Sequence, residues 1–112
     1  MITIDDLKNY GANVDEGLSR CMGNEALYLK LVAIVPGEEG FKKLKDGIDS
    51  KNLDAAFESA HALKGVTGNL SLTPLYEPLV SITELLRGRE NIDYSELLDE
   101  ILTQREKLEK LC

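Results

Sequence analysis

The sequence predicts an all-α protein, an antiparallel up-down four-helix bundle with short additional helices at its N-terminus. Apolar residues recur at steps of three and four, the spacing of one helix face, along most of the chain. Strand signals are nearly absent, because aromatic residues are only 5% of the chain and apolar and polar residues never alternate for long. With 112 residues, 43% of them hydrophobic, the chain has the length for one core. We therefore expect a single domain over residues 1–112.

The N-terminal half is expected to hold two short helices and one long, bent helical element. The short helices cover about residues 3–10 and 15–22. Asn24 can cap the long element, which continues to about Ile48 and is interrupted at Pro36-Gly37. Its apolar stripe is predicted to begin with Leu27, Leu31, Ile34 and Val35 and to continue with Phe41, Leu44 and Ile48.

The second half predicts three more helices joined by short loops. Asn52 caps the first, whose core stripe is Leu53, Ala56, Phe57, Ala60, Leu63, Thr67 and Leu70. Thr73-Pro74 opens the next helix, which stops before Gly88, and Pro78 is expected to bend its first turn. Residues 93–96 resemble a capping box and start a last helix that runs to the C-terminus. Because short loops force neighbouring helices to be antiparallel, the pattern favours an up-down bundle.

Charge and composition narrow the possible partners. Thirteen basic and twenty acidic residues give a formal net charge of -7, which disfavours binding to nucleic acid or to an anionic membrane. Cys21 and Cys112 lie far apart in the sequence, so we expect both to be reduced, as in a cytosol. No apolar run approaches the roughly 20 residues that span a bilayer, and the N-terminus lacks the basic start of a signal peptide. We expect a cytoplasmic protein without membrane insertion.

The residue that most needs an explanation is His61, the only histidine. Gly65 and Gly68 follow it in a segment without proline, although each glycine costs a helix about 1 kcal/mol relative to alanine. With Ala60 at the centre of the buried face, His61 falls roughly 100° away, at the edge of that face. Lys64, Gly65 and Gly68 lie on the same side of the helix as His61, so the two glycines are expected to leave the imidazole uncrowded.

Two interpretations of His61 stay open at this point. In the first, it is an ordinary boundary histidine, and the glycines mark a loose or ending helix. In the second, it is a nucleophile, because an exposed imidazole is largely neutral at neutral pH and its nitrogen can attack phosphorus. Lys64, one turn along, could then hold the oxygens of a phosphoryl group.

At these residues the chain resembles the histidine-containing phosphotransfer (HPt) domain, whose motif is a helical His-x-x-Lys-Gly followed by small residues. Here the motif reads His61-Ala62-Leu63-Lys64-Gly65, with Gly68 at the next small position. The resemblance extends over nearly the whole chain, since the predicted helices fall where that family places its four. It implies that His61 is phosphorylated, that Lys64 stabilises the phosphoryl group, and that Gly65 and Gly68 leave room for a receiver domain to dock.

Two positions depart from the family pattern. Ser71 stands where the family often has glycine, and Val66 stands where it often has a small residue.

An apolar rim around His61 should complete the docking surface, with Phe57, Ile4, Leu7 and Leu27 as candidates.

The same resemblance gives the function and partners that we expect. A phosphocarrier needs no nucleotide pocket, metal or cofactor of its own, because the receiver domain brings the aspartate and the Mg²⁺. The sequence has no phosphate-binding loop for ATP and no cluster of metal ligands at motif spacing, so kinase activity is not expected. The expected partners are response-regulator receiver domains and a hybrid sensor histidine kinase. The alternative is a helical adaptor or inhibitory bundle that binds signalling partners without phosphotransfer.

Overall fold

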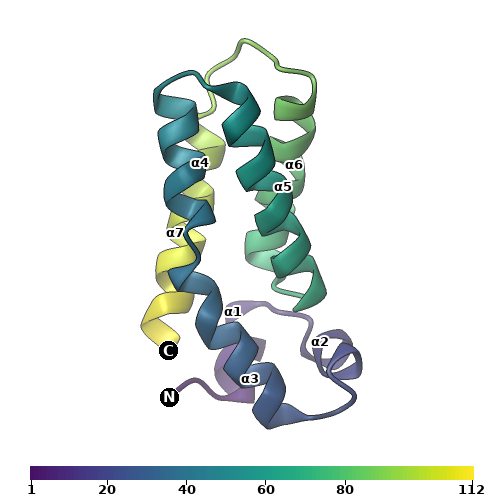
Figure 1. The fold of residues 1–112 in the computed structure, drawn as a ribbon. Helices are drawn as coiled ribbons and strands as arrows, with labels where there is room; N and C mark the ends of the chain where they lie inside the picture. The colour runs from purple at the N-terminus through teal and green to yellow at the C-terminus, as the bar shows by residue number, and fades with distance from the viewer.

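A computed structural model describes all 112 residues and confirms the all-α class. It contains seven α-helices, one short 3-10 helix and no strand (Figure 1). None of the helices combines the length and the apolar character that crossing a bilayer requires. The elements in chain order are α1 (Ile4–Tyr10), α2 (Val14–Arg20), α3 (Glu25–Ile34), η1 (Val35–Gly37), α4 (Gly40–Asp49), α5 (Leu53–Asn69), α6 (Thr73–Arg87) and α7 (Ser95–Leu111).

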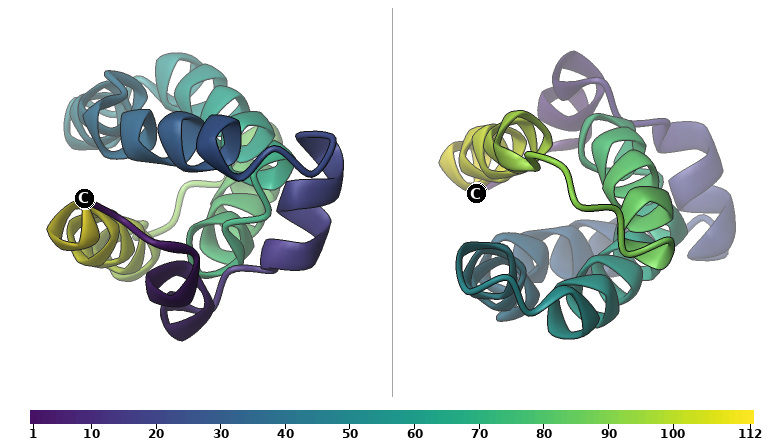
Figure 2. Two further views of the ribbon diagram at one scale, coloured as in Figure 1. Left: turned by 90° about the horizontal axis from the view of Figure 1, so that it is seen from below. Right: turned by 90° about the horizontal axis from the view of Figure 1, so that it is seen from above.

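The predicted up-down bundle is formed by α4, α5, α6 and α7. In Figure 1, α4 and α6 run upward while α5 and α7 run downward. Viewed along the bundle, these four helices occupy the corners of a square (Figure 2). The helix α3 continues the line of α4 downward through η1, and α1 and α2 lie with it at the lower end. The short N-terminal helices are therefore additions to one end of the bundle.

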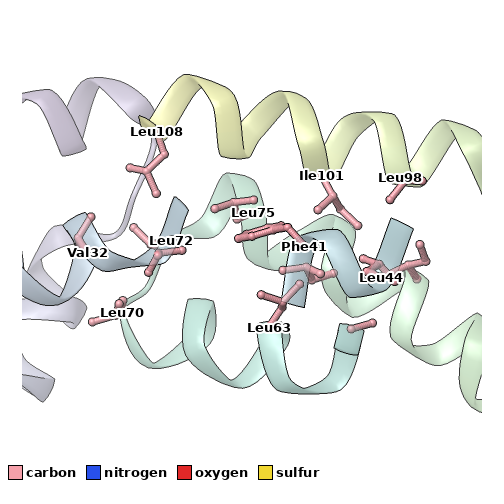
Figure 3. Packing of buried hydrophobic residues seen from close by; sticks show 14 of the residues in the cluster. Val32, Phe41, Leu44, Leu63, Leu70, Leu72, Leu75, Leu98, Ile101 and Leu108 are labelled. Atoms are coloured by element: carbon pink, nitrogen blue, oxygen red, sulfur yellow. The ribbon is translucent and has the colours of Figure 1, made fainter. Parts of the chain in front are cut away.

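The core lies between the four bundle helices and extends down to α3. Figure 3 shows side chains from all of them pointing toward one another, among them Phe41 of α4, Leu63 of α5 and Leu75 of α6. Arg105 of α7 covers the Phe41 ring, with its guanidinium carbon 5.4 Å from the ring centroid. The same side chain donates from Nε to the carbonyl oxygen of Pro36 over 2.7 Å. Arg105 thus closes the core at η1, between α3 and α4.

The structure corrects the prediction for the long N-terminal element. The interruption at Pro36 is confirmed, but it separates two helices instead of bending one. The prediction of which face of α3 is buried was wrong. The helix is apolar on more than one side, and it buries the face next to the one that we predicted. Tyr28 anchors that face by donating its hydroxyl to the carbonyl oxygen of Leu70 over 2.8 Å, and burial raises the pKa of Tyr28 to about 12. The buried residues are Tyr28, Val32 and Val35, while Leu27, Leu31 and Ile34 are exposed.

Three helices begin with an asparagine cap, two of which the sequence predicted. The Oδ1 atom of Asn24 accepts the backbone N–H of Leu27 over 3.0 Å, and that of Asn52 accepts the N–H of Ala55 over 3.2 Å. Asn13 caps α2 in the same way. Each cap satisfies a backbone donor that the first helical turn leaves without a partner.

The predicted starts of α6 and α7 are wrong in detail. Thr73 is the first residue of α6 and not its cap, and no side chain caps this helix, which is continuous through Pro78. The predicted capping box before α7 does not form. Instead, the carboxylate of Asp93 accepts the backbone N–H of Ser95 over 2.9 Å, and hydrogen bonding to Ser95 lowers the pKa of Asp93.

Four helices are each followed by a residue that has a left-handed backbone conformation although it is not glycine. The residues are Met22, Lys51, Ser71 and Arg89, with φ between 52° and 59°. Each lies one position beyond the helix cap in the hydrogen-bonding pattern of a Schellman motif, where glycine is usually found. Gly88, the predicted stop of α6, has a φ of -80°, and Arg89 after it makes the turn. These ends carry strain, because a left-handed conformation costs a side-chain-bearing residue about 1–2 kcal/mol.

We therefore expect K51G to stabilise the fold. Lys51 is exposed and takes part in none of the ion pairs, so the substitution relieves the strain at the end of α4 without breaking an ion pair. The free energy of unfolding should rise by about 1 kcal/mol, measured by urea denaturation. K51A is the control, since alanine keeps the left-handed strain and should give no such gain.

Candidate functional site

The helix α5 carries the candidate site and runs without a break through both glycines that follow His61. Its buried residues are Ala56, Ala60, Leu63 and Thr67, all of which belong to the predicted stripe, whereas Leu53 and Phe57 of that stripe are only half-buried. Thr67 satisfies its buried hydroxyl by donating to the carbonyl oxygen of Leu63 over 2.9 Å. Gly65 therefore lies within a regular helix, whereas Gly68 lies in its last turn, one residue before the end of α5 at Asn69. The helices α4 and α6 pack directly against α5.

His61 is exposed on this helix and has one well-defined neighbour. Its imidazole stacks on the ring of Phe57, one turn earlier, with 5.7 Å between the ring centroids and 10° between the ring planes. The imidazole forms no hydrogen bond within the chain and joins none of the ion pairs. A nitrogen nucleophile is thus presented to solvent from a rigid helix, with one of its sides covered by an aromatic ring.

Lys64 lies one turn after His61 and is half-buried. It takes part in none of the six ion pairs of the structure, so no carboxylate of this chain holds its ammonium group. Its side chain lines an open groove of about 480 Å³ between α2, α5 and α6, together with Gly65, Gly68 and Asn69. Residues three apart on a helix are neighbours, so Lys64 lies one turn from His61, which does not itself line this groove.

The two glycines differ in their surroundings. A Cβ built on Gly65 meets nothing within 4 Å, so this position is open. A Cβ on Gly68 would lie 2.8 Å from Cε1 of the Tyr76 ring. Gly68 therefore already has a role within the fold, since it lets the Tyr76 side chain of α6 lie against α5. The open space predicted for a docking partner is present at Gly65. At Gly68 the Tyr76 side chain of the same chain occupies that space.

Phe57 has contacts that sequence analysis did not anticipate. The guanidinium carbons of Arg87 and Arg89 lie 5.2 Å and 4.9 Å from the centroid of its ring. Arg89 also donates from Nε to Oδ1 of Asp54 over 2.7 Å. No local pattern could have revealed these contacts, because they join residues about 30 positions apart. The antiparallel pairing of α5 with α6 brings the end of α6 next to the start of α5.

Comparison with family models gives one match, the Hpt domain, over residues 36–111. The chain belongs to the Hpt domain family. Hpt domains take part in phosphotransfer within two-component phosphorelays, which agrees with the resemblance of the His61 motif. Comparisons with curated proteins and with solved structures give no match. The matched part contains all four bundle helices, while α1, α2 and α3 precede it.

One departure from the Hpt pattern has a structural explanation. Ser71 stands where glycine is frequent in Hpt domains, and it is one of the four residues in the left-handed region, with a φ of 55°. Its hydroxyl donates to Oε1 of Glu16 over 3.0 Å. In this Hpt domain serine adopts the left-handed conformation that glycine favours, and its hydroxyl ties α2 to the end of α5.

The predicted apolar rim is only partly accessible. Leu7 is completely buried beneath α1, so it cannot contact a partner, and its inclusion in the rim was wrong. Leu27 is exposed, while Ile4 and Phe57 are half-buried. Leu7 is the buried residue of the short helix α1, which packs this side against the core.

Titratable side chains do not gather into a metal-binding arrangement anywhere in this Hpt domain. Cys21 is buried and Cys112 is exposed, and neither is paired in a disulfide. The chemistry available at the site is thus that of one imidazole, one ammonium group and the backbone around Gly65.

The contrast between the two glycines predicts different effects of alanine. G65A should raise the free energy of unfolding by about 1 kcal/mol, since alanine is the better helix former and its methyl group meets open space. G68A should give a smaller gain or none, because the Tyr76 ring must move away. Urea denaturation of both variants measures the difference, and equal gains would contradict the close approach of Tyr76 to Gly68.

Proposed function

We propose that this Hpt domain is a phosphorelay carrier in which His61 accepts a phosphoryl group from the aspartate of one receiver domain and passes it to another. The observation that carries the proposal is the geometry of α5. The only imidazole of the chain is exposed, Lys64 is unpaired one turn away, and Gly65 is open. An incoming active site can therefore reach the nitrogen of His61 without displacing a side chain of this chain.

The reaction is an in-line transfer of the phosphoryl group from a carboxylate oxygen of the receiver aspartate to an imidazole nitrogen of His61. A bond forms between an imidazole nitrogen and phosphorus, and the P–O bond to the receiver aspartate breaks. The electron pair of that bond leaves with the carboxylate, and the imidazole releases its N–H proton to solvent. The ammonium group of Lys64 is placed to neutralise charge on the phosphoryl oxygens. The receiver supplies the aspartate and the Mg²⁺, and this chain supplies the nucleophile and its positioning.

The partners that we propose are response-regulator receiver domains and a hybrid sensor histidine kinase, and the place of action is the cytoplasm. The expected absence of kinase activity follows from the chemistry, since His61 can only take up a phosphoryl group that another protein has already activated.

The decisive test is phosphorylation of the purified domain by a panel of phosphorylated receiver domains. Wild-type protein should gain a phosphate that is labile in acid and stable in base, which identifies phosphohistidine. H61Q should gain none, because glutamine lacks a nucleophilic nitrogen but is similar in size. An unlabelled wild type, or a label that survives H61Q, would contradict the carrier function and leave the helical adaptor.

Lys64 should affect the rate of transfer or the lifetime of the phosphoryl group and not the fold. We expect K64A to lower the transfer rate or shorten the lifetime of phosphohistidine by about three- to tenfold, the range of one solvent-accessible charge-assisted hydrogen bond. The control is K107A, which removes the same charge from an exposed position on α7. Equal kinetics of K64A and K107A would remove Lys64 from the site.

A further inference from the structure

The ring of Phe57 is the meeting point of three side chains. The imidazole of His61 stacks on it, and the guanidinium groups of Arg87 and Arg89 lie about 5 Å from its centroid. The two arginines are held differently. Arg87 has only Glu84 as a partner, at 3.4 Å, and both side chains are more than half exposed. Arg89 donates to Oδ1 of Asp54 and, through Nη1, to the carbonyl oxygen of Leu86, both over 2.7 Å. Arg89 is therefore the fixed member of the pair.

Arg89 differs from the other left-handed helix ends in what its side chain contacts. Its φ of 52° is shared, within a few degrees, by Met22, Lys51 and Ser71. The ion pair with Asp54 is solvent-exposed, with 82% of the carboxylate side chain accessible, so it contributes little to stability. The contact with the Phe57 ring is therefore the feature that sets Arg89 apart from these residues.

We propose that Arg89 is a positioning residue for His61 and acts through Phe57, an inference that rests on the proposed phosphotransfer function. Asp54, Phe57 and His61 follow one another at steps of three and four along one side of α5, and Arg89 reaches this side from the turn after α6. The guanidinium group, fixed at both ends by hydrogen bonds, packs against the Phe57 ring. The ring in turn restricts the imidazole that stacks on it. The chain Asp54, Arg89, Phe57 and His61 thus holds the nucleophile in one orientation.

The expected size of the effect follows from side-chain rotamers. A surface side chain of a helix without such a neighbour is distributed over two staggered χ1 wells, because χ1 near +60° clashes with the preceding turn. If only one of them presents the nitrogen correctly, loss of the restraint lowers the reactive fraction by up to about twofold. This factor should appear with any phosphoryl donor, because it belongs to the imidazole and not to the partner.

The test compares R89G with K51G, which is a closely matched control. Both substitutions place glycine at a left-handed helix end, but only Arg89 contacts Phe57. The probe is phosphoramidate, which needs no receiver domain: its P–N bond breaks, ammonia leaves with the proton of the imidazole, and phosphohistidine forms. R89G should be labelled up to about twofold more slowly than wild type, with an unfolding midpoint that is not lower. K51G should be labelled at the wild-type rate.

Nuclear magnetic resonance gives a second readout, and it needs no reaction. Because His61 is the only histidine, its imidazole protons give one set of signals, and the stacked Phe57 ring should shift them. F57L should abolish this ring-current shift and R89G should reduce it, while K51G should leave it unchanged. R89K, which keeps the charge but loses the planar fork, should give an intermediate shift.

The outcomes separate this inference from the proposed function. If wild type is labelled and R89G matches it in rate and in ring-current shift, Arg89 does not position His61, and the carrier function stands. An unfolding midpoint of R89G well below that of wild type would make Arg89 a residue of the fold and overturn the inference. If wild type takes no label from phosphoramidate or from receiver domains, the carrier function fails, and the ring-current shift alone decides whether Arg89 holds the imidazole.

Discussion

The packing of α5 between α4 and α6 is the constraint on which the rest of the structure depends. The two glycines after His61 each weaken the helix by about 1 kcal/mol, and an isolated helix of this length is marginal even without them. Its neighbours hold it in shape. Ala56 and Ala60 are completely buried, and α4 approaches so closely that a Cβ on Gly47 would lie 2.9 Å from the backbone nitrogen of Ala56. Because one face is held this tightly, the opposite face can be open and still rigid.

This arrangement separates the two demands on the helix. The buried face provides stability with small and apolar side chains, and the exposed face presents His61, Lys64 and Gly65. Phe57 lies at the boundary between the faces and is half-buried. It therefore takes part in packing and also contacts the imidazole. Boundary positions are where a bundle can link its internal order to a reactive side chain at its surface.

Local patterns in the sequence were sufficient for α5 and insufficient for contacts between helices. The asparagine cap at Asn52, the buried stripe and the position of His61 at its edge all follow from spacing along one helix, and the structure agrees. The buried face of α3 could not be chosen this way, because both candidate faces are apolar and only the tertiary contact from Tyr28 to Leu70 decides between them. The same limit applies to Arg89, whose contacts with Asp54 and Phe57 depend on how α6 lies beside α5.

The N-terminal helices α1, α2 and α3, which precede the part that matches the Hpt family, contribute contacts at the end of α5. The last carbonyl groups of any helix lack partners within it, and an unpaired buried carbonyl is costly. Here the N-terminal segment supplies donors to three carbonyl groups within about one turn of the chain at this end: Arg20 to the carbonyl of Gly68, Tyr28 to that of Leu70, and the backbone N–H of Asn13 to that of Ser71. The segment is therefore tied, about two turns from the imidazole, to the helix that carries His61. A partner that moved α2 or α3 would have to break these bonds.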